Sequence, residues 1–266
     1  MKHLYFLIAV VFINLVKGIL NPRFHRNWGL LNQDGCGLQP ALNKAPTLDL
    51  PDIGPEPVEV QEGEYPWVVQ IHMENPAKEG ADKENSCMGT IISKRHILTA
   101  SSCFRIYECD PIDPHTISVV AGRTDLLCSD PVCEEHMKLY NVTQVFFRNT
   151  NGPPQEGQNI ALIQMATDFD FNDFVRPICV ENGYLIHKDY SKEHGMRVTG
   201  WGVNNYANNF TRNLMHARVW IYPEDYNDFI YKLLPESFQD QETYDTFFCV
   251  EARKTSPFIR PTSAVL

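Results

Sequence analysis

Six short apolar runs follow one another along the middle of this chain, with turn-forming residues between them. They occupy residues 67–73, 88–92, 97–100, 117–121, 142–147 and 160–165. Runs of this length suit β-strands better than helices, and six of them at this spacing predict a closed antiparallel barrel. The sequence therefore predicts an all-β fold.

The amino-acid composition agrees with an all-β fold, and the net charge disfavours some classes of binding partner. The chain has 266 residues, 43% of them apolar, which suits one large domain or two small ones with a buried core. Eighteen prolines and fifteen glycines favour a fold rich in strands and loops over a helical bundle. The formal net charge of −10 disfavours nucleic acids and anionic membranes as main partners.

The first 18 residues are typical of a secretory signal peptide. Lys2 and His3 precede an apolar stretch over residues 4–16, and Gly18 offers a small side chain at a cleavage site. The alternative, a membrane anchor, is disfavoured because about thirteen residues are too few to span a bilayer. We therefore expect a secreted, extracellular protein with no membrane anchor after cleavage. Its eight cysteines suit that oxidising compartment.

Flanking segments differ from the strand-rich middle. Residues 19–53 carry several prolines and glycines and no strand alternation, which predicts an extended pro-segment. Further apolar runs lie at 197–201, 214–222 and 247–250, and one or two helical turns are expected within 225–234. Residues 250–266 lack alternation and are expected to form a disordered tail.

Two sites for N-linked glycosylation are expected in a secreted chain. Asn141 begins the triplet Asn-Val-Thr, and Asn209 begins the triplet Asn-Phe-Thr. Both triplets fit the acceptor pattern for sugar transfer to asparagine.

Five segments in chain order carry a resemblance to a known family. They are Tyr-Pro-Trp-Val-Val at 65–69, the stretch between two cysteines at 87–103, Asn-Ile-Ala-Leu at 159–162, Phe-Val-Arg-Pro-Ile-Cys at 174–179 and Val-Thr-Gly-Trp-Gly at 198–202. Over residues 54–249 the chain resembles the trypsin-like (chymotrypsin-fold) serine proteases. The resemblance implies a double antiparallel β-barrel, with a complete first barrel and a second barrel that lacks about half its strands.

The resemblance also shows where the catalytic residues would lie, and both identifiable positions differ. In the family a Thr-Ala-Ala-His segment supplies the general base, but here Thr-Ala-Ser-Ser ends in Ser102. A hydroxyl cannot accept and return a proton near neutral pH as an imidazole does. Asn159 stands where the family has the aspartate that orients the histidine, and an amide supplies no charge. The serine proteases' Gly-Asp-Ser-Gly-Gly-Pro segment, which carries the nucleophile, has no counterpart after Cys249.

Activation by cleavage is not expected either. The family is cut after a basic residue to release an Ile-Val-Gly-Gly terminus, whereas the corresponding stretch here is Gly-Pro-Glu-Pro at 54–57. Pro55 lacks a backbone N–H. We therefore expect no catalytic residues, no cofactor and no proteolysis.

Other residues could be considered as replacements for the missing base or nucleophile. His72 and His96 lie near predicted strands, where packing or exposure to solvent is the more common role. Ser101 and Ser102 could act as nucleophiles only with an activating base, and the sequence places none beside them.

The resemblance implies two disulfide bonds. Cys87 would pair with Cys103 and close the loop at the histidine position. Cys36 would pair with Cys179 and tether the pro-segment to the protease-like domain.

The remaining cysteines are not assigned by the resemblance. Tyr226 occupies the position of the usual partner of Cys249, so Cys249 is expected to be left over. Cys109, Cys128 and Cys133 can form one pair among themselves, and the sequence does not fix which. A zinc site at these three is disfavoured by their irregular spacing and by the oxidising compartment, so no metal is expected.

The leading hypothesis is a secreted, catalytically inactive serine protease homologue that acts by protein binding or regulation. An open half-barrel would expose strand edges, through which an as yet unidentified protein partner could associate. One alternative is a non-functional truncated isoform that is cleared in the secretory pathway. A third hypothesis, a serine-type endopeptidase, conflicts with Ser102 and Asn159.

Overall fold

The computed structural model describes residues 31, 35–42, 57–76, 79–80, 84–107, 112–128, 131–147, 159–180, 196–204, 209–221 and 250–251. The expected signal peptide, most of the expected pro-segment, the helical turns expected at 225–234 and most of the expected tail lie outside these residues.

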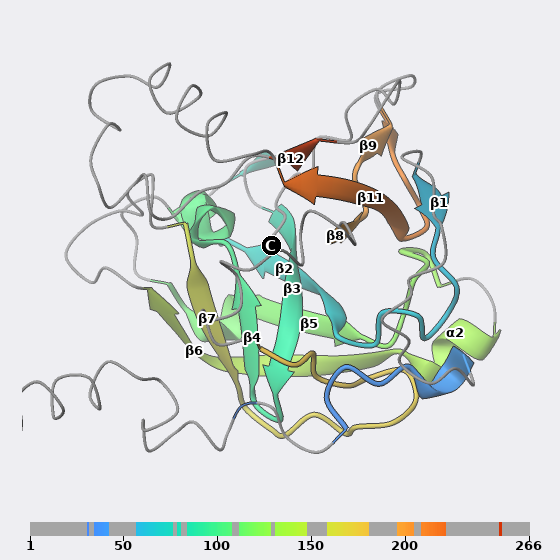
Figure 1. Ribbon diagram of the computed structural model, residues 1–266. Helices are drawn as coiled ribbons and strands as arrows, with labels where there is room; N and C mark the ends of the chain where they lie inside the picture. Colours follow the sequence, from blue (N-terminus) through green and yellow to red (C-terminus); the bar gives the residue numbers. More distant parts are fainter. Residues whose placement is uncertain are drawn as a thin grey trace, which may run out of the picture.

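Six antiparallel strands close into one barrel, as the six apolar runs predict (Figure 1). Around the barrel the strands are β2 (Val68–Glu74), β3 (Glu84–Ser93), β4 (His96–Thr99), β7 (Ala161–Met165), β6 (Lys138–Phe147) and β5 (Ile117–Ala121). The barrel closes because β5 pairs with β2 as well as with β6. Each of the six predicted runs falls on one of these strands.

Alternation along the strands fills the barrel with apolar side chains. In β7 the buried residues are Ala161, Ile163 and Met165, which alternate with partly exposed ones. Ile71, Ile97, Val119 and Ile163 come from four different strands and are fully buried in one cluster. Because successive side chains of a strand point to opposite faces, this pattern places one face of every strand in the core.

A second, open sheet is built around β11 (Met215–Ile221). It pairs with β8 (Met196–Gly200) along most of its length, with β1 (Val58–Glu59) at one end and with β12 (Val250–Glu251) at the other. A separate pair is formed by β9 (Val203–Asn204) and β10 (Asn209–Phe210). Among the described residues only the first barrel is closed, in agreement with the predicted incomplete second barrel.

Strand pairing continues beyond the predicted start of the tail. β12 begins at Val250 and pairs with the end of β11, Ile221 opposite Val250 and Trp220 opposite Glu251. β12 thus includes the first two residues of the stretch that was expected to form a tail. β11 supplies backbone pairing for this segment, although the segment has no alternation of apolar and polar residues.

Helical segments among the described residues are few and short. They are η3 (Pro40–Leu42), η5 (Ser101–Tyr107), η6 (Pro114–Thr116) and α2 (Pro131–His136). In the part of the chain that the structure describes, no helix has the length and apolar character needed to cross a membrane. The fold is all-β, as predicted.

Three disulfide bonds are present among the described residues. Cys36 pairs with Cys179 and Cys87 with Cys103, the two bonds that the resemblance implies. The third joins Cys128 to Cys133, a pairing that the sequence left open. Cys109 and Cys249 lie outside the described residues.

Residues 35–42, which lie in the expected pro-segment, are held against residues 63–64 and 177–179 by more than their disulfide. The Gly37 N–H donates to the carbonyl of Pro177 at 2.9 Å, and the Gln39 side chain donates to the carbonyl of Glu64. Gly63 has a φ of +72°, and a Cβ there would lie 2.3 Å from the Cβ of Ala41. Close approach of Ala41 thus requires glycine at this turn.

Candidate functional site

Ser102 and Asn159 lie side by side because the strands next to them are paired. Asn159 comes two residues before β7, and η5 begins two residues after β4 ends. Thr99 of β4 lies opposite Ala161 of β7, which brings the two flanking segments together. The Cys87–Cys103 bond ties the start of η5 to β3, and Thr99 Oγ1 donates to the carbonyl of Met88 at 2.7 Å.

The Asn159 amide oxygen is the acceptor at the centre of this position. Its Oδ1 accepts the Ser102 backbone N–H at 2.7 Å and the Ser101 hydroxyl at 3.1 Å. Ser101 is buried, whereas Ser102 is half-buried and Asn159 is exposed. The arrangement fixes the backbone at the start of η5. It places a hydroxyl and a neutral amide together, and neither group is a base near neutral pH.

His96 lies at the other end of β4 from this position. Its Nδ1 is 2.8 Å from Ser93 Oγ, and Ser93 is buried at the hairpin between β3 and β4. Burial lowers the pKa of His96, and the positive charge of Arg95 acts in the same direction. Because β4 separates His96 from Ser102, the two groups are not brought together.

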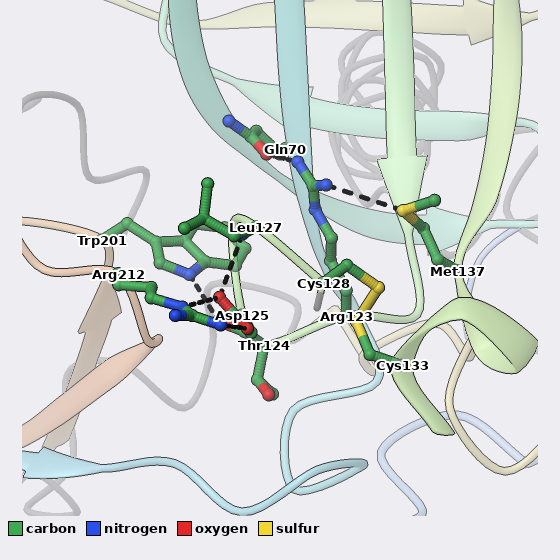
Figure 2. The surroundings of a disulfide bond; sticks show 10 residues. All are labelled: Gln70, Arg123, Thr124, Asp125, Leu127, Cys128, Cys133, Met137, Trp201 and Arg212. Carbon is green, nitrogen blue, oxygen red and sulfur yellow. Dashed lines mark hydrogen bonds and ion pairs between the residues drawn. A yellow bond between two sulfur atoms is a disulfide. The ribbon is translucent and has the colours of Figure 1, made fainter. Parts of the chain in front are cut away.

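His72 lies on the outer side of β2, where its neighbour is an arginine. His72 Nε2 is 3.5 Å from Arg123 Nη2, and the same nitrogen donates to Gln70 Oε1. Arg123 Nη1 contacts Met137 Sδ at 3.6 Å (Figure 2). Burial lowers the pKa of Arg123, and the carboxylate of Asp125 opposes that effect. These contacts give His72 a place in a polar layer on the barrel surface.

A buried polar network, which the sequence analysis missed, joins the first barrel to the second sheet. The Tyr65 hydroxyl lies 2.7 Å from His216 Nδ1 and accepts from Arg197 Nη1 at 2.9 Å. Glu64 Oε1 lies 3.4 Å from Arg197 Nη1 and 3.5 Å from His216 Nδ1. His216 is 151 positions from Tyr65, so no local pattern could have revealed the contact.

Burial shifts the titration of this network. It raises the pKa of Tyr65 to about 12, although the hydrogen bond from Arg197 acts the other way. Burial also lowers the pKa of His216, although the Glu64 carboxylate opposes it. At neutral pH the tyrosine is therefore protonated and the histidine uncharged, and their hydrogen bond links the segment before β2 to β11.

A loop after β5 makes a second junction between the two sheets (Figure 2). The Trp201 indole N–H donates to the carbonyl of Thr124 at 2.7 Å. Arg212 binds both carboxylate oxygens of Asp125, at 2.7 and 2.6 Å. The backbone N–H of Leu214 also donates to Thr124, at 2.8 Å. The Cys128–Cys133 bond closes the same loop and limits its motion.

Metal and sugar sites can be examined in the described residues. No group of three histidine, cysteine or acidic side chains there could hold a metal ion. Asn141 is exposed on β6, as an acceptor of a sugar must be. Asn209 lies on β10, and its side chain is outside the described part.

Comparison with known proteins agrees with this architecture. The family model described as Trypsin matches residues 56–257. Coagulation factor XI of Bos taurus is 25% identical over 157 residues, which are 59% of this chain and 23% of the relative. The Spaetzle-processing enzyme of Drosophila melanogaster is 27% identical over 152 residues, 53% of this chain and 37% of the relative.

A third relative shares a larger part of its own length. The venom peptide isomerase heavy chain of Agelenopsis aperta is 26% identical over 161 residues, which are 60% of each protein. The chain thus spans less than two thirds of each of these relatives. The family match covers most of the chain, including the closed barrel and the open sheet, and the chain belongs to the trypsin family.

Proposed function

We propose that this protein is a secreted, catalytically inactive member of the trypsin family that acts by binding another protein. The pair Ser102 and Asn159 carries the proposal. Together they occupy the positions that supply the base and its orienting carboxylate in the family, and they offer neither.

Hydrogen bonding at this pair supports the loss of base chemistry. In a working triad the third residue keeps a negative charge next to the imidazole and steadies its positive form. Here the Asn159 oxygen is used instead to accept from Ser102 N–H and Ser101 Oγ. Neither His72 nor His96 is positioned by its contacts to take the place of the missing histidine.

Secretion is supported by the N-terminal sequence and by the cysteines. The basic and apolar pattern of residues 1–18 suits a signal peptide. Three disulfide bonds suit an oxidising compartment, because cytosolic thiols are kept reduced.

Binding is proposed to use the open second sheet. In the described residues β8 pairs only with β11, and the proposed partner would add a strand at the other edge of β8. A partner that supplies an extended segment would complete the sheet. The identity of this partner protein is open to experiment.

A serine-directed covalent probe tests inactivity directly. The purified glycoprotein is incubated with a fluorophosphonate, alongside an active trypsin at the same concentration. We expect labelling of the trypsin and none of this protein. Stoichiometric labelling would overturn the proposal in favour of the serine endopeptidase alternative, and the Ser102→Ala variant would then show whether Ser102 reacts.

Expression in secretory cells separates binding from clearance. A folded, glycosylated protein in the medium is expected if the chain acts by binding. Retention in the endoplasmic reticulum followed by degradation would instead support a non-functional isoform. A protein recovered from the medium can then be used to capture partners from the native secretion.

A further inference from the structure

The glycosylation triplet on β6 lies on the outer face of the closed barrel. Tyr140 and Val142 point inward and are 8% and 3% exposed. Asn141 and Thr143 alternate with them and are exposed. The acceptor asparagine and the threonine that the transferase requires therefore share the solvent side of the strand.

Strand register shows what surrounds Asn141 on that face. Asn141 lies opposite Ser118 of β5, and Ser118 lies opposite His72 of β2. In the adjacent row Leu139 lies opposite Val120, which lies opposite Gln70. Leu139 is on the same side of β6 as Asn141 and is 66% exposed.

Val120 and Gln70 are already buried by the protein, which leaves Leu139 and Ser118 as the more exposed part of this face. We propose that an N-linked glycan on Asn141 covers this part, around Leu139 and Ser118, and closes it to protein partners. The proposal rests on the proposed secretion, because the sugar is added in the secretory pathway. A glycan is bulky and well hydrated. Its attachment point, Asn141, lies directly opposite Ser118 on the neighbouring strand and two residues from Leu139 on the same strand. A protein surface could not reach Leu139 or Ser118 without displacing it.

The same geometry leaves the Ser102–Asn159 end of the barrel open. Val142 lies opposite Met165, whereas Phe147 lies opposite Ala161 at the other end of the pair β6–β7. From Met165 to Asn159 the chain covers six residues, or roughly 20 Å if extended throughout. Ile160, beside Asn159, is 39% exposed. The glycan thus directs partners away from the face with Leu139 and leaves the side with Ile160 accessible.

Two cysteine variants report on this shielding. Leu139→Cys places a thiol two residues from Asn141, and Ile160→Cys places one at the far end. Each secreted variant is treated with a small maleimide and with a polymer-linked maleimide, before and after enzymatic removal of sugars from the folded protein. The parent protein gives the background from its own cysteines.

We expect removal of the sugar to raise labelling of Leu139→Cys by the polymer reagent about tenfold, because a bulky group next to the thiol is lost. Labelling by the small reagent should change little, and Ile160→Cys should label equally before and after treatment. Adding Thr143→Ala to Leu139→Cys should give full polymer labelling without enzyme. Thr143→Ser, which keeps the acceptor triplet, should preserve the protection.

Equal polymer labelling of Leu139→Cys with and without the sugar would overturn the shielding. A secreted protein without sugar on Asn141 would overturn it as well. Both results leave the proposed inactivity intact, which the fluorophosphonate probe tests separately. Failure of secretion would contradict the proposed function itself.

Discussion

The closed barrel and the open sheet are stabilised in different ways. In the part of the chain that the structure describes, nineteen buried residues form one cluster inside the barrel, whereas five form a cluster between the barrel and the second sheet. In the barrel every strand has two neighbours, but in the second sheet β8 pairs only with β11 among the described residues. Among the described residues, the barrel therefore has a larger core and more complete strand pairing than the second sheet.

Residues of the second half pack against side chains of the first half. Tyr65 and Val68, beside and within the first barrel, share their cluster with Trp201 and Leu214 of the second half. The network of Glu64, Arg197 and His216 and the Trp201–Thr124 hydrogen bond add polar contacts. We infer that the sheet is held as a dependent layer on the barrel. This predicts separate responses of the two regions to mutation.

Core truncation should give the largest effects and separate the regions most clearly. Ile163→Ala removes a fully buried side chain from the barrel and should lower the free energy of unfolding by about 2–5 kcal/mol. Leu214→Ala creates a cavity in the small cluster and should cost a similar amount, but only for opening of the second sheet. Urea unfolding followed by circular dichroism should show one shifted transition for Ile163→Ala and an added early transition for Leu214→Ala. A single transition shifted equally by both variants would contradict the separation.

Loss of the indole hydrogen bond should have a smaller effect at the junction. Trp201→Phe removes the donor to the Thr124 carbonyl and should destabilise the second sheet by about 1–3 kcal/mol. Tyr140→Phe is the matched control, because it removes a hydroxyl that accepts the Asp170 N–H in the barrel. Susceptibility to limited proteolysis after residue 195 should rise in the first variant and not in the second. Equal susceptibility of the two variants would show that the Trp201–Thr124 hydrogen bond does not stabilise the second sheet.

The ion pair between Asp125 and Arg212 should contribute less. Half of the Arg212 side chain is exposed, so solvent screens the pair, and Asp125→Asn should cost about 0.5–1 kcal/mol. The effect should shrink in high salt because mobile ions screen exposed charges. Thermal unfolding of both proteins at low and high salt measures this difference. A loss that is unchanged by salt would indicate that the carboxylate acts mainly through its hydrogen bond to Leu127 N–H.

A change of pH is the mildest perturbation, because it alters charge and removes no atoms. The pKa of His216 is lowered in the folded protein below its ordinary value of 6.5, chiefly by burial. As the pH falls below 6.5, His216 in the unfolded chain binds a proton more readily than His216 in the folded protein. The free energy of unfolding therefore decreases as the pH falls. Urea midpoints between about pH 7.5 and about pH 5.5 should show this loss, and His216→Gln should reduce its pH dependence. The lowered pKa of His96 adds a similar effect within the barrel, which the variant retains.

Much of the barrel could be predicted from the sequence because its signals are local. Apolar runs such as 160–165 carry the alternation of a half-buried strand, and β7 lies there. The same holds for the main strands β8 and β11 of the second sheet. By contrast, β1 and β12 are two residues each and depend on β11 for their pairing. No local pattern of that length is informative.

In the candidate site, too, some residues could be identified from local sequence, whereas other contacts depend on the tertiary structure. Ser102 and Asn159 were identified because each lies in a segment with a recognisable neighbourhood, and the pairing of β4 with β7 brings them together. The Cys128–Cys133 bond depends on the course of one loop, which cysteine spacing alone does not determine. The contact of Tyr65 with His216 depends on how two sheets pack, which is decided far along the chain.

Hydrogen–deuterium exchange along the chain tests most directly whether the barrel is a self-sufficient unit with a dependent second sheet. We expect amides of β4 and β7 to exchange slowest and only through global unfolding. Amides of β8 and β11 should exchange faster, through a partial opening. The free energy of this opening should depend less on denaturant concentration than the free energy of global unfolding does. If both groups exchange at one rate with one denaturant dependence, the two regions unfold as a single unit and the account is contradicted.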